Sequence, residues 1–149
     1  GRSTVEIHYL LEGLPQDRPL LFAAEFNFAG MPAGADDRYF YGQDRHRHGQ
    51  LGARLDLHEA SELGLVDEWL GVDVNLAFSR PSGIWTFPIE AVSQSEGGFE
   101  LVHQSVAVFP HWNVVGDADG RWSVAMNLAL DTSLAEQRRQ QPHPEAVAT

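Results

Sequence analysis

Residues 71–90, GVDVNLAFSRPSGIWTFPIE, carry the alternation that decides the fold. Residues two apart in a β-strand share a face. Residues 71–78 place four apolar side chains on one face, opposite two polar ones: Val72, Val74, Leu76 and Phe78 against Asp73 and Asn75. Residues 83–90 align Trp85, Phe87 and Ile89 in the same way, and the intervening Arg80-Pro81-Ser82-Gly83 has the composition of a turn. This stretch therefore predicts two half-buried strands joined by a turn.

The same period of two recurs on both sides of this stretch, in residues 4–11, 20–28 and 122–130. Residues 99–112 differ, because apolar residues occur on both faces of the predicted strand. This pattern predicts a central strand that is covered on both sides. Gly97-Gly98 and Asp119-Gly120 are further turns, since glycine accepts positive φ. We predict an all-β domain over residues 1–132, an antiparallel two-sheet β-sandwich.

Two segments lack this alternation. Residues 30–50, rich in Gly, Asp, Arg and His, form the longest predicted loop. Residues 134–141 alone have helical propensity and lead into Pro142-His143-Pro144. We therefore predict a short helix or a loose C-terminal tail over residues 133–149.

Composition narrows the function classes. The 149 residues carry a formal net charge of −11, and all ten basic residues are arginine. Such a chain repels phosphate backbones and anionic lipid, so we expect neither nucleic acid nor membrane as a partner; a sugar or a protein surface stays open. The chain has no cysteine, which excludes disulfides and thiolate ligands and fits a reducing, cytoplasmic compartment.

Two short motifs resemble metal sites, but each has a simpler interpretation. His46 and His48 alternate on one side of an extended segment, yet the flanking arginines disfavour a cation, so a solvated loop is favoured. Asp117-x-Asp119-Gly120 resembles the start of a calcium loop but lacks the later oxygen ligands, so a hairpin turn is favoured. We expect no metal and no cofactor.

Catalytic patterns are equally sparse. The sequence has no nucleophile elbow, P-loop or dinucleotide fingerprint. Paired carboxylates hydrolyse glycosides, and four acidic residues lie on or near predicted strands: Glu25, Asp73, Glu90 and Glu96. Acidic residues are abundant in this chain, so solvent-facing positions are the simpler interpretation.

The segment from Trp85 to Trp112 interleaves aromatic rings with planar hydrogen-bonding groups, a combination that suits sugar recognition. A core hairpin with internally bonded polar groups is the alternative, and the one we favour. The carbohydrate-binding candidates are Trp85, Glu90, Gln94, Glu96, His103, His111 and Trp112.

The runs FPIEAVSQSEGGFE (87–100), HQSVAVFPHW (103–112) and AEFNF (24–28) resemble the C-terminal β domain of family 57 glycoside hydrolases, the α-amylase and 4-α-glucanotransferase type. The resemblance runs from about residue 4 to residue 131. It implies a supersandwich similar to galactose mutarotase. In such enzymes the catalytic carboxylates lie on an N-terminal (β/α)₇ barrel, and no stretch here alternates strands with helices as a barrel must.

The resemblance therefore implies a non-catalytic accessory domain, excised or separately encoded, that packs on the missing barrel and contacts α-glucan. Two alternatives stay open. One is a mutarotase-like sugar epimerase, with Glu90, Glu96, His103 and His111 as acid–base candidates. The other is a free-standing carbohydrate-binding module, with Trp69, Trp85 or Trp112 in an open groove.

Loss of a barrel partner would leave an orphaned surface, which favours self-association. We expect a weak two-fold homodimer. The predicted loop contributes candidate contacts, since aromatic residues and Met are enriched at interface cores. These contacts are Met31, Tyr39, Phe40 and Tyr41.

Overall fold

The computed structural model describes residues 1–141 and confirms the all-β class, with 63% of these residues in strands. The strands are β1 (Arg2–Leu11), β2 (Leu20–Ala23), β3 (Phe26–Ala29), β4 (Arg38–Tyr41), β5 (Arg47–Gln50), β6 (Asp56–Asp67), β7 (Val72–Ser95), β8 (Gly98–Val114) and β9 (Trp122–Asp131). A 3₁₀ turn, η1 (Gln43–Arg45), and one helix, α1 (Ser133–Gln140), complete the elements. Within residues 1–141 no helix is long and apolar enough to cross a membrane.

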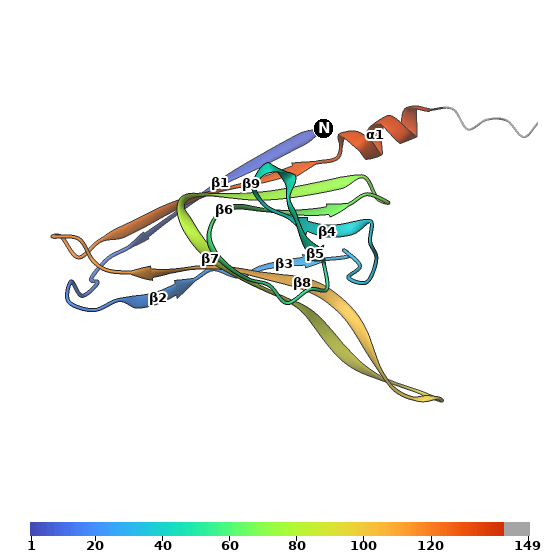
Figure 1. Cartoon of the computed structure of the whole chain (residues 1–149), viewed down its shortest axis with the longest axis horizontal. Coiled ribbons are helices and arrows are strands. Elements are labelled where there is room, and N and C mark those ends of the chain that lie inside the picture. Colours follow the sequence, from blue (N-terminus) through green and yellow to red (C-terminus); the bar gives the residue numbers. More distant parts are fainter. Residues whose placement is uncertain (142–149) are drawn as a thin grey trace, which may run out of the picture.

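One continuous antiparallel sheet bends over to make both layers of the sandwich (Figure 1). The first layer runs β1-β9-β7-β6-β4-β5. The second layer is centred on β8, which pairs with β2, β3 and the C-terminal half of β7. A core lies between the layers and includes Phe40, Leu65, Leu76, Ile84 and Val108, each fully buried.

The predicted turn at residues 80–83 is wrong, because β7 continues through it as a single strand of 24 residues. Its N-terminal half pairs with β9 up to Phe78, and its C-terminal half pairs with β8 from Gly83. At this corner, side chains replace ladder bonds: Ser79 Oγ accepts from the Ala125 N–H at 2.8 Å, and Arg80 Nε donates to the Ser123 carbonyl at 2.8 Å. The turn-like composition thus marks a strand that changes layers.

Because β7 is unbroken, even-numbered residues face the core on both sides of the corner. Ile84 is fully buried, and the side chain of Thr86, 2% exposed, donates to the Ala53 carbonyl at 2.8 Å. Trp85 is instead 38% exposed. The aligned aromatics Trp85 and Phe87 therefore lie on the outer face of the second layer.

The predicted loop at residues 30–50 contains β4, η1 and β5. Its apolar residues are buried in the fold: Met31, Tyr39, Phe40 and Tyr41 are each 9% exposed or less. They are therefore not available as dimer contacts, and the prediction that these four residues form a homodimer interface is wrong. The next strand, β6, was not anticipated at all.

Two other predicted strands need adjustment. Residues 20–28 form two short strands, β2 and β3, which both pair with β8. The prediction of a covered central strand holds for residues 105–112 of β8 but fails for 99–104, where the side chains are mostly exposed. The turn at Gly97-Gly98 is confirmed, as is the hairpin at residues 117–120, where the Gly120 N–H donates to the Asp117 carbonyl at 2.9 Å.

The two ends of the described chain are held together. β1 pairs along its whole length with β9, from Arg2 opposite Asp131 to Leu11 opposite Trp122. The Thr132 N–H then donates to the Gly1 carbonyl at 2.8 Å, just before α1 begins. The predicted helix is confirmed as α1, and residues 142–149 of the predicted tail lie outside the described residues.

The orientation of β7 predicts that removing the smaller side chain of Ile84 lowers stability more than removing the larger side chain of Trp85. Ile84→Ala should lower the unfolding free energy by about 2–5 kcal/mol, because it leaves a cavity in the core. Trp85→Ala should cost less than half as much, although it removes a larger side chain, because that ring is partly solvated. Urea denaturation of both variants measures the difference, and a greater cost for Trp85→Ala would mean that the register is wrong.

Candidate functional site

A groove of about 420 Å³ opens at the bend of β7, which we call the corner groove. β6, β7, β8 and β9 all contribute to it. Its lining residues are His58, Glu59, Arg80, Pro81, Gly83, His111, Trp112, Asn113 and Trp122. Aromatic rings and polar groups thus lie together at one surface depression.

Gly83 creates room for the ring of His111. A Cβ at position 83 would lie 2.2 Å from His111 Cε1, so only glycine fits without displacing the ring. The imidazole stacks on Trp85 with ring centroids 3.8 Å apart. The Trp85 indole N–H in turn donates to Asp56 Oδ1 at 3.1 Å, which fixes the indole plane.

The opposite wall of the corner groove comes from an irregular part of β6. The register with β7 shifts between Leu57 and Ala60, and Glu59 there has φ of 50°, a left-handed conformation unusual for a non-glycine residue. Strained backbone of this kind costs about 1–3 kcal/mol and is concentrated at functional sites. On the far side, the Arg80 guanidinium lies 5.2 Å from the centre of the Trp122 ring.

Electrostatics in the corner groove favour a neutral imidazole. Burial lowers the pKa of His111, and nearby Asp56 partly opposes that effect. Within residues 1–141, His111 Nε2 is a buried nitrogen without a hydrogen-bond partner. The arrangement offers donors, acceptors and aromatic surface, which are means of binding.

The structure brings together only some of the predicted site residues. His111 and Trp112 line the corner groove, although Trp112 is only 6% exposed, and Trp85 stacks on His111 without lining the groove itself. Gln94 and Glu96 are exposed on the distal part of the β7–β8 hairpin, and Glu90 is exposed at its base. His103 lies at the base of that hairpin, with Nε2 2.9 Å from the Met31 carbonyl oxygen.

This placement bears on the epimerase alternative. His103 and His111 are eight positions apart on β8, about 26 Å at roughly 3.3 Å per residue. His103 and His111 therefore do not converge on one sugar, whereas Glu90 lies directly opposite His103 on the same face, so that pair alone of the candidates lies close together.

Sequence reasoning missed seven of the nine residues that line the corner groove, among them His58, Glu59, Arg80 and Trp122. His58 and Glu59 belong to the unanticipated strand β6, and Arg80 was assigned to a turn. Trp122 was recognised as part of an alternating strand, but that pattern carries no information about which other strands lie beside it.

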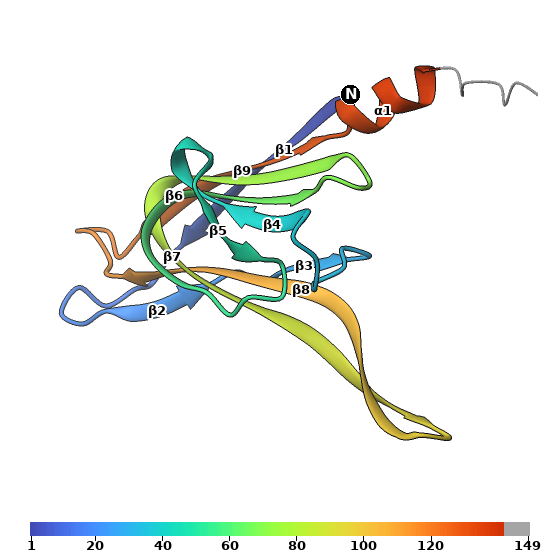
Figure 2. The ribbon, with the colours of Figure 1, turned by 45° about the vertical axis from the view of Figure 1, so that its right-hand side comes forward.

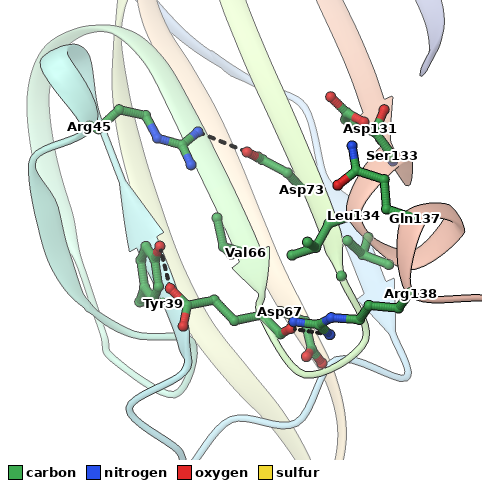
Figure 3. Close-up of a pocket in the computed structure, with 13 residues that line it drawn as sticks. Tyr39, Arg45, Val66, Asp67, Asp73, Asp131, Ser133, Leu134, Gln137 and Arg138 are labelled. Atoms are coloured by element: carbon green, nitrogen blue, oxygen red, sulfur yellow. Dashed lines mark hydrogen bonds and ion pairs between the residues drawn. The ribbon is translucent and has the colours of Figure 1, made fainter. Parts of the chain in front are cut away.

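A second pocket, of about 480 Å³, lies between α1 and strands β4, β6 and β7 (Figure 3). Its polar groups are paired with one another. Arg45 Nη1 bonds Asp73 at 2.8 Å, and the Tyr39 hydroxyl donates to Glu68 at 3.0 Å. Arg138 Nη1 donates to the carbonyls of Glu68 and Trp69, both at 2.8 Å. We interpret this pocket as the seam that fastens α1 to the sheet.

The two motifs with metal-like spacing are also accounted for. The rings of His46 and His48 lie 5.4 Å apart, and burial together with His46 lowers the pKa of His48. Asp117 Oδ1 accepts from the N–H groups of Asp119 and Arg121, both at 2.9 Å, and so closes the hairpin turn. Within the described residues, no group of three or more His, Asp or Glu side chains could hold a metal ion.

Comparison with known proteins gives one family. The family model described as alpha-amylase/4-alpha-glucanotransferase, C-terminal, matches residues 1–126. No curated protein sequence matches the chain. Among solved structures, a 4-alpha-glucanotransferase from Thermococcus litoralis is similar at 17% identity and a TM-score of 0.51, over 84% of this chain and 16% of that one. The Slr1438 protein from Synechocystis sp. PCC 6803 has 14% identity and a TM-score of 0.45, over 87% of this chain and 51% of that one.

The lowered pKa of His111 predicts a pH dependence of stability. Below the ordinary value of 6.5, the unfolded chain binds this proton more readily than the folded chain, so the unfolding free energy falls as pH drops through that window. His111→Phe keeps an aromatic ring against Trp85 and should flatten this decline. Urea denaturation between pH 7.5 and 5.5 measures it, with exposed His8→Phe as the control; equal slopes in both variants would contradict the prediction.

The seam under α1 gives a second prediction. Gly71 has φ of 73°, and a Cβ there would lie 2.6 Å from the Ala135 backbone nitrogen. Gly71→Ala should therefore displace α1 and speed the amide exchange of residues 133–140. Gly30 has φ of 77° with nothing near its Cβ position, so Gly30→Ala supplies the same backbone strain, about 1 kcal/mol or more, without the clash. Equal exchange of α1 in both variants would mean that Gly71 is not part of the seam.

Proposed function

The chain belongs to the family of C-terminal domains of α-amylases and 4-α-glucanotransferases, and from this premise we propose that it is a non-catalytic accessory domain of a family 57, α-glucan-active enzyme. Its role is to pack on the catalytic domain of that enzyme, which we call the parent enzyme. The family match over residues 1–126 is the observation that carries the proposal, since it includes nearly the whole β-sandwich. The chain spans about a sixth of the Thermococcus litoralis glucanotransferase, so the larger part of such an enzyme would be the partner.

The arrangement of acidic residues favours a non-catalytic role. Asp73 is engaged by Arg45 and by the Tyr41 hydroxyl, and Glu25 accepts from Asn27 at 2.8 Å. Retaining and inverting glycosidases need two carboxyl groups that face one bond, about 5–10 Å apart. Of the carboxylates named from the sequence, Asp73 and Glu90 lie in opposite halves of β7, Glu25 lies between β2 and β3, and Glu96 lies in the turn between β7 and β8.

A second role is favoured by the corner groove. Sugar rings stack their C–H faces on aromatic rings, and their hydroxyls need donors and acceptors. Trp122, with His58 and Glu59 beside it, supplies both at an open depression. We propose that this groove makes an auxiliary contact with α-glucan when the parent enzyme holds its substrate.

Activity assays test the proposal. The isolated chain should leave maltotetraose unchanged, and the parent enzyme should redistribute it into shorter and longer oligosaccharides. Redistribution by the isolated chain would contradict the non-catalytic assignment. The chain should also co-purify with the catalytic domain when the two are produced together, and failure to do so would contradict the accessory role.

Titration with maltoheptaose tests the corner groove separately. Tryptophan fluorescence should change with a Kd on the order of 1 mM, which is about 4 kcal/mol of binding free energy. His58→Ala should weaken this binding, because an exposed polar group of the groove is lost. Exposed His8→Ala is the matched control, and an equal effect of both substitutions would remove the groove from consideration.

A further inference from the structure

The β7–β8 hairpin extends well beyond the body of the sandwich (Figures 1 and 2). We call residues 90–103 the arm. Within the described chain, the arm residues pair only with one another, from Glu90 opposite His103 to Ser95 opposite Gly98. A two-stranded ribbon without further packing is marginally stable in water, so the arm is an unsupported part of the sheet.

One face of the arm carries three large apolar side chains, with Gln94 opposite one of them and Glu90 and His103 at its base. Val92 lies directly opposite Leu101, and Phe99 lies one cross-strand pair further toward the tip on the same face. These three side chains are 67%, 68% and 78% exposed, respectively. The opposite face is smaller and more polar, with Ala91, Ser93, Ser95, Glu100 and Val102.

The apolar face continues the core-facing side of the sheet. Even-numbered residues of β7 point into the core at Ile84 and Thr86, and Val92 keeps that parity. The register shift at Ile89/Glu90 places the extra residue in β8, at Gln104, so the alternation of β7 is undisturbed. The arm therefore presents an inner sheet face that the other layer of this chain does not cover.

The charge of the arm indicates what kind of surface covers it. Its ionised side chains are all acidic, Glu90, Glu96 and Glu100, and the whole chain carries a formal charge of −11. A second copy would bring these carboxylates against one another, and like charges across an interface are unfavourable. The complementary surface is an apolar depression with basic side chains at its rim.

We infer that the apolar face of the arm, formed by Val92, Phe99 and Leu101, docks into such a basic-rimmed depression on the catalytic domain of the parent enzyme. This inference rests on the proposed accessory function and specifies the surface through which it operates. Three clustered apolar side chains surrounded by polar ones match the size of a binding hot spot. Docking supplies the missing layer over the arm.

Amide hydrogen exchange tests the inference in the isolated chain and in the assembled parent enzyme. We expect the amides of residues 90–103 to exchange at least about tenfold more slowly in the assembled enzyme, because docking suppresses opening of the hairpin. Protection confined to other parts of this domain would overturn the arm inference and leave the accessory function standing. If no surface of this domain were protected in the assembled enzyme, both the arm inference and the accessory function would be overturned.

A variant series makes the test specific to the apolar face. Val92→Thr/Phe99→Thr/Leu101→Thr removes the apolar stripe but keeps residues that favour strands. It should abolish the protection, whereas Ala91→Thr/Val102→Thr, on the opposite face, should preserve it. Circular dichroism and the urea midpoint of each isolated variant establish that it folds. If the triple variant does not fold, the single variant Phe99→Thr replaces it in the exchange experiment.

Self-association is the competing outcome. Light scattering of the isolated chain should give a monomer mass up to high micromolar concentration. The inference would be overturned if the isolated chain formed a dimer that the triple variant abolishes, and if the amide protection of residues 90–103 rose with protein concentration. The arm would then dock on a second copy of this chain.

Discussion

The continuity of β7 through its corner is the constraint on which the rest of the structure depends. One strand serves both layers, so the alternation that buries Leu76 also buries Ile84. The corner interrupts the ladder beside β9. The side chains of Ser79 and Arg80 bond the Ala125 N–H and the Ser123 carbonyl there, and a hydrogen bond of this kind contributes about 0.5–1.5 kcal/mol. β6 bends at the same level through its irregularity at Glu59.

This constraint also explains which parts of the fold could be predicted from the sequence. Period-two alternation correctly located β1, β7, β8 and β9, because burial on one face acts residue by residue, but it missed β4, β5 and β6. The segment Arg80–Gly83 misled, since Pro and Gly serve a reversing turn and a layer-changing strand equally well. The buried run Tyr39-Phe40-Tyr41 was hidden within a polar segment, and only its pairing with β6 makes it part of the core.

The sequence predicted those residues of the candidate site that are close to one another along the chain. Trp85 and His111 were named from an aromatic-rich segment, and their stacking is a cross-strand contact within one hairpin. His58 and Trp122 reach the corner groove from strands far away in the sequence. Alternation gives the face of a residue but not the neighbouring strand, so these contributions needed the topology.

The pairing of β1 with β9 has a consequence for how the molecule forms. Arg2 meets Asp131 across nearly the whole described chain, and closing so long a loop carries a large entropic cost before any contact forms. The β7–β8 hairpin, by contrast, joins residues that are close in sequence. Folding should therefore begin with the β7–β8 hairpin and end with the pairing of β1 and β9. During synthesis, β1 waits with an unpaired edge until β9 emerges.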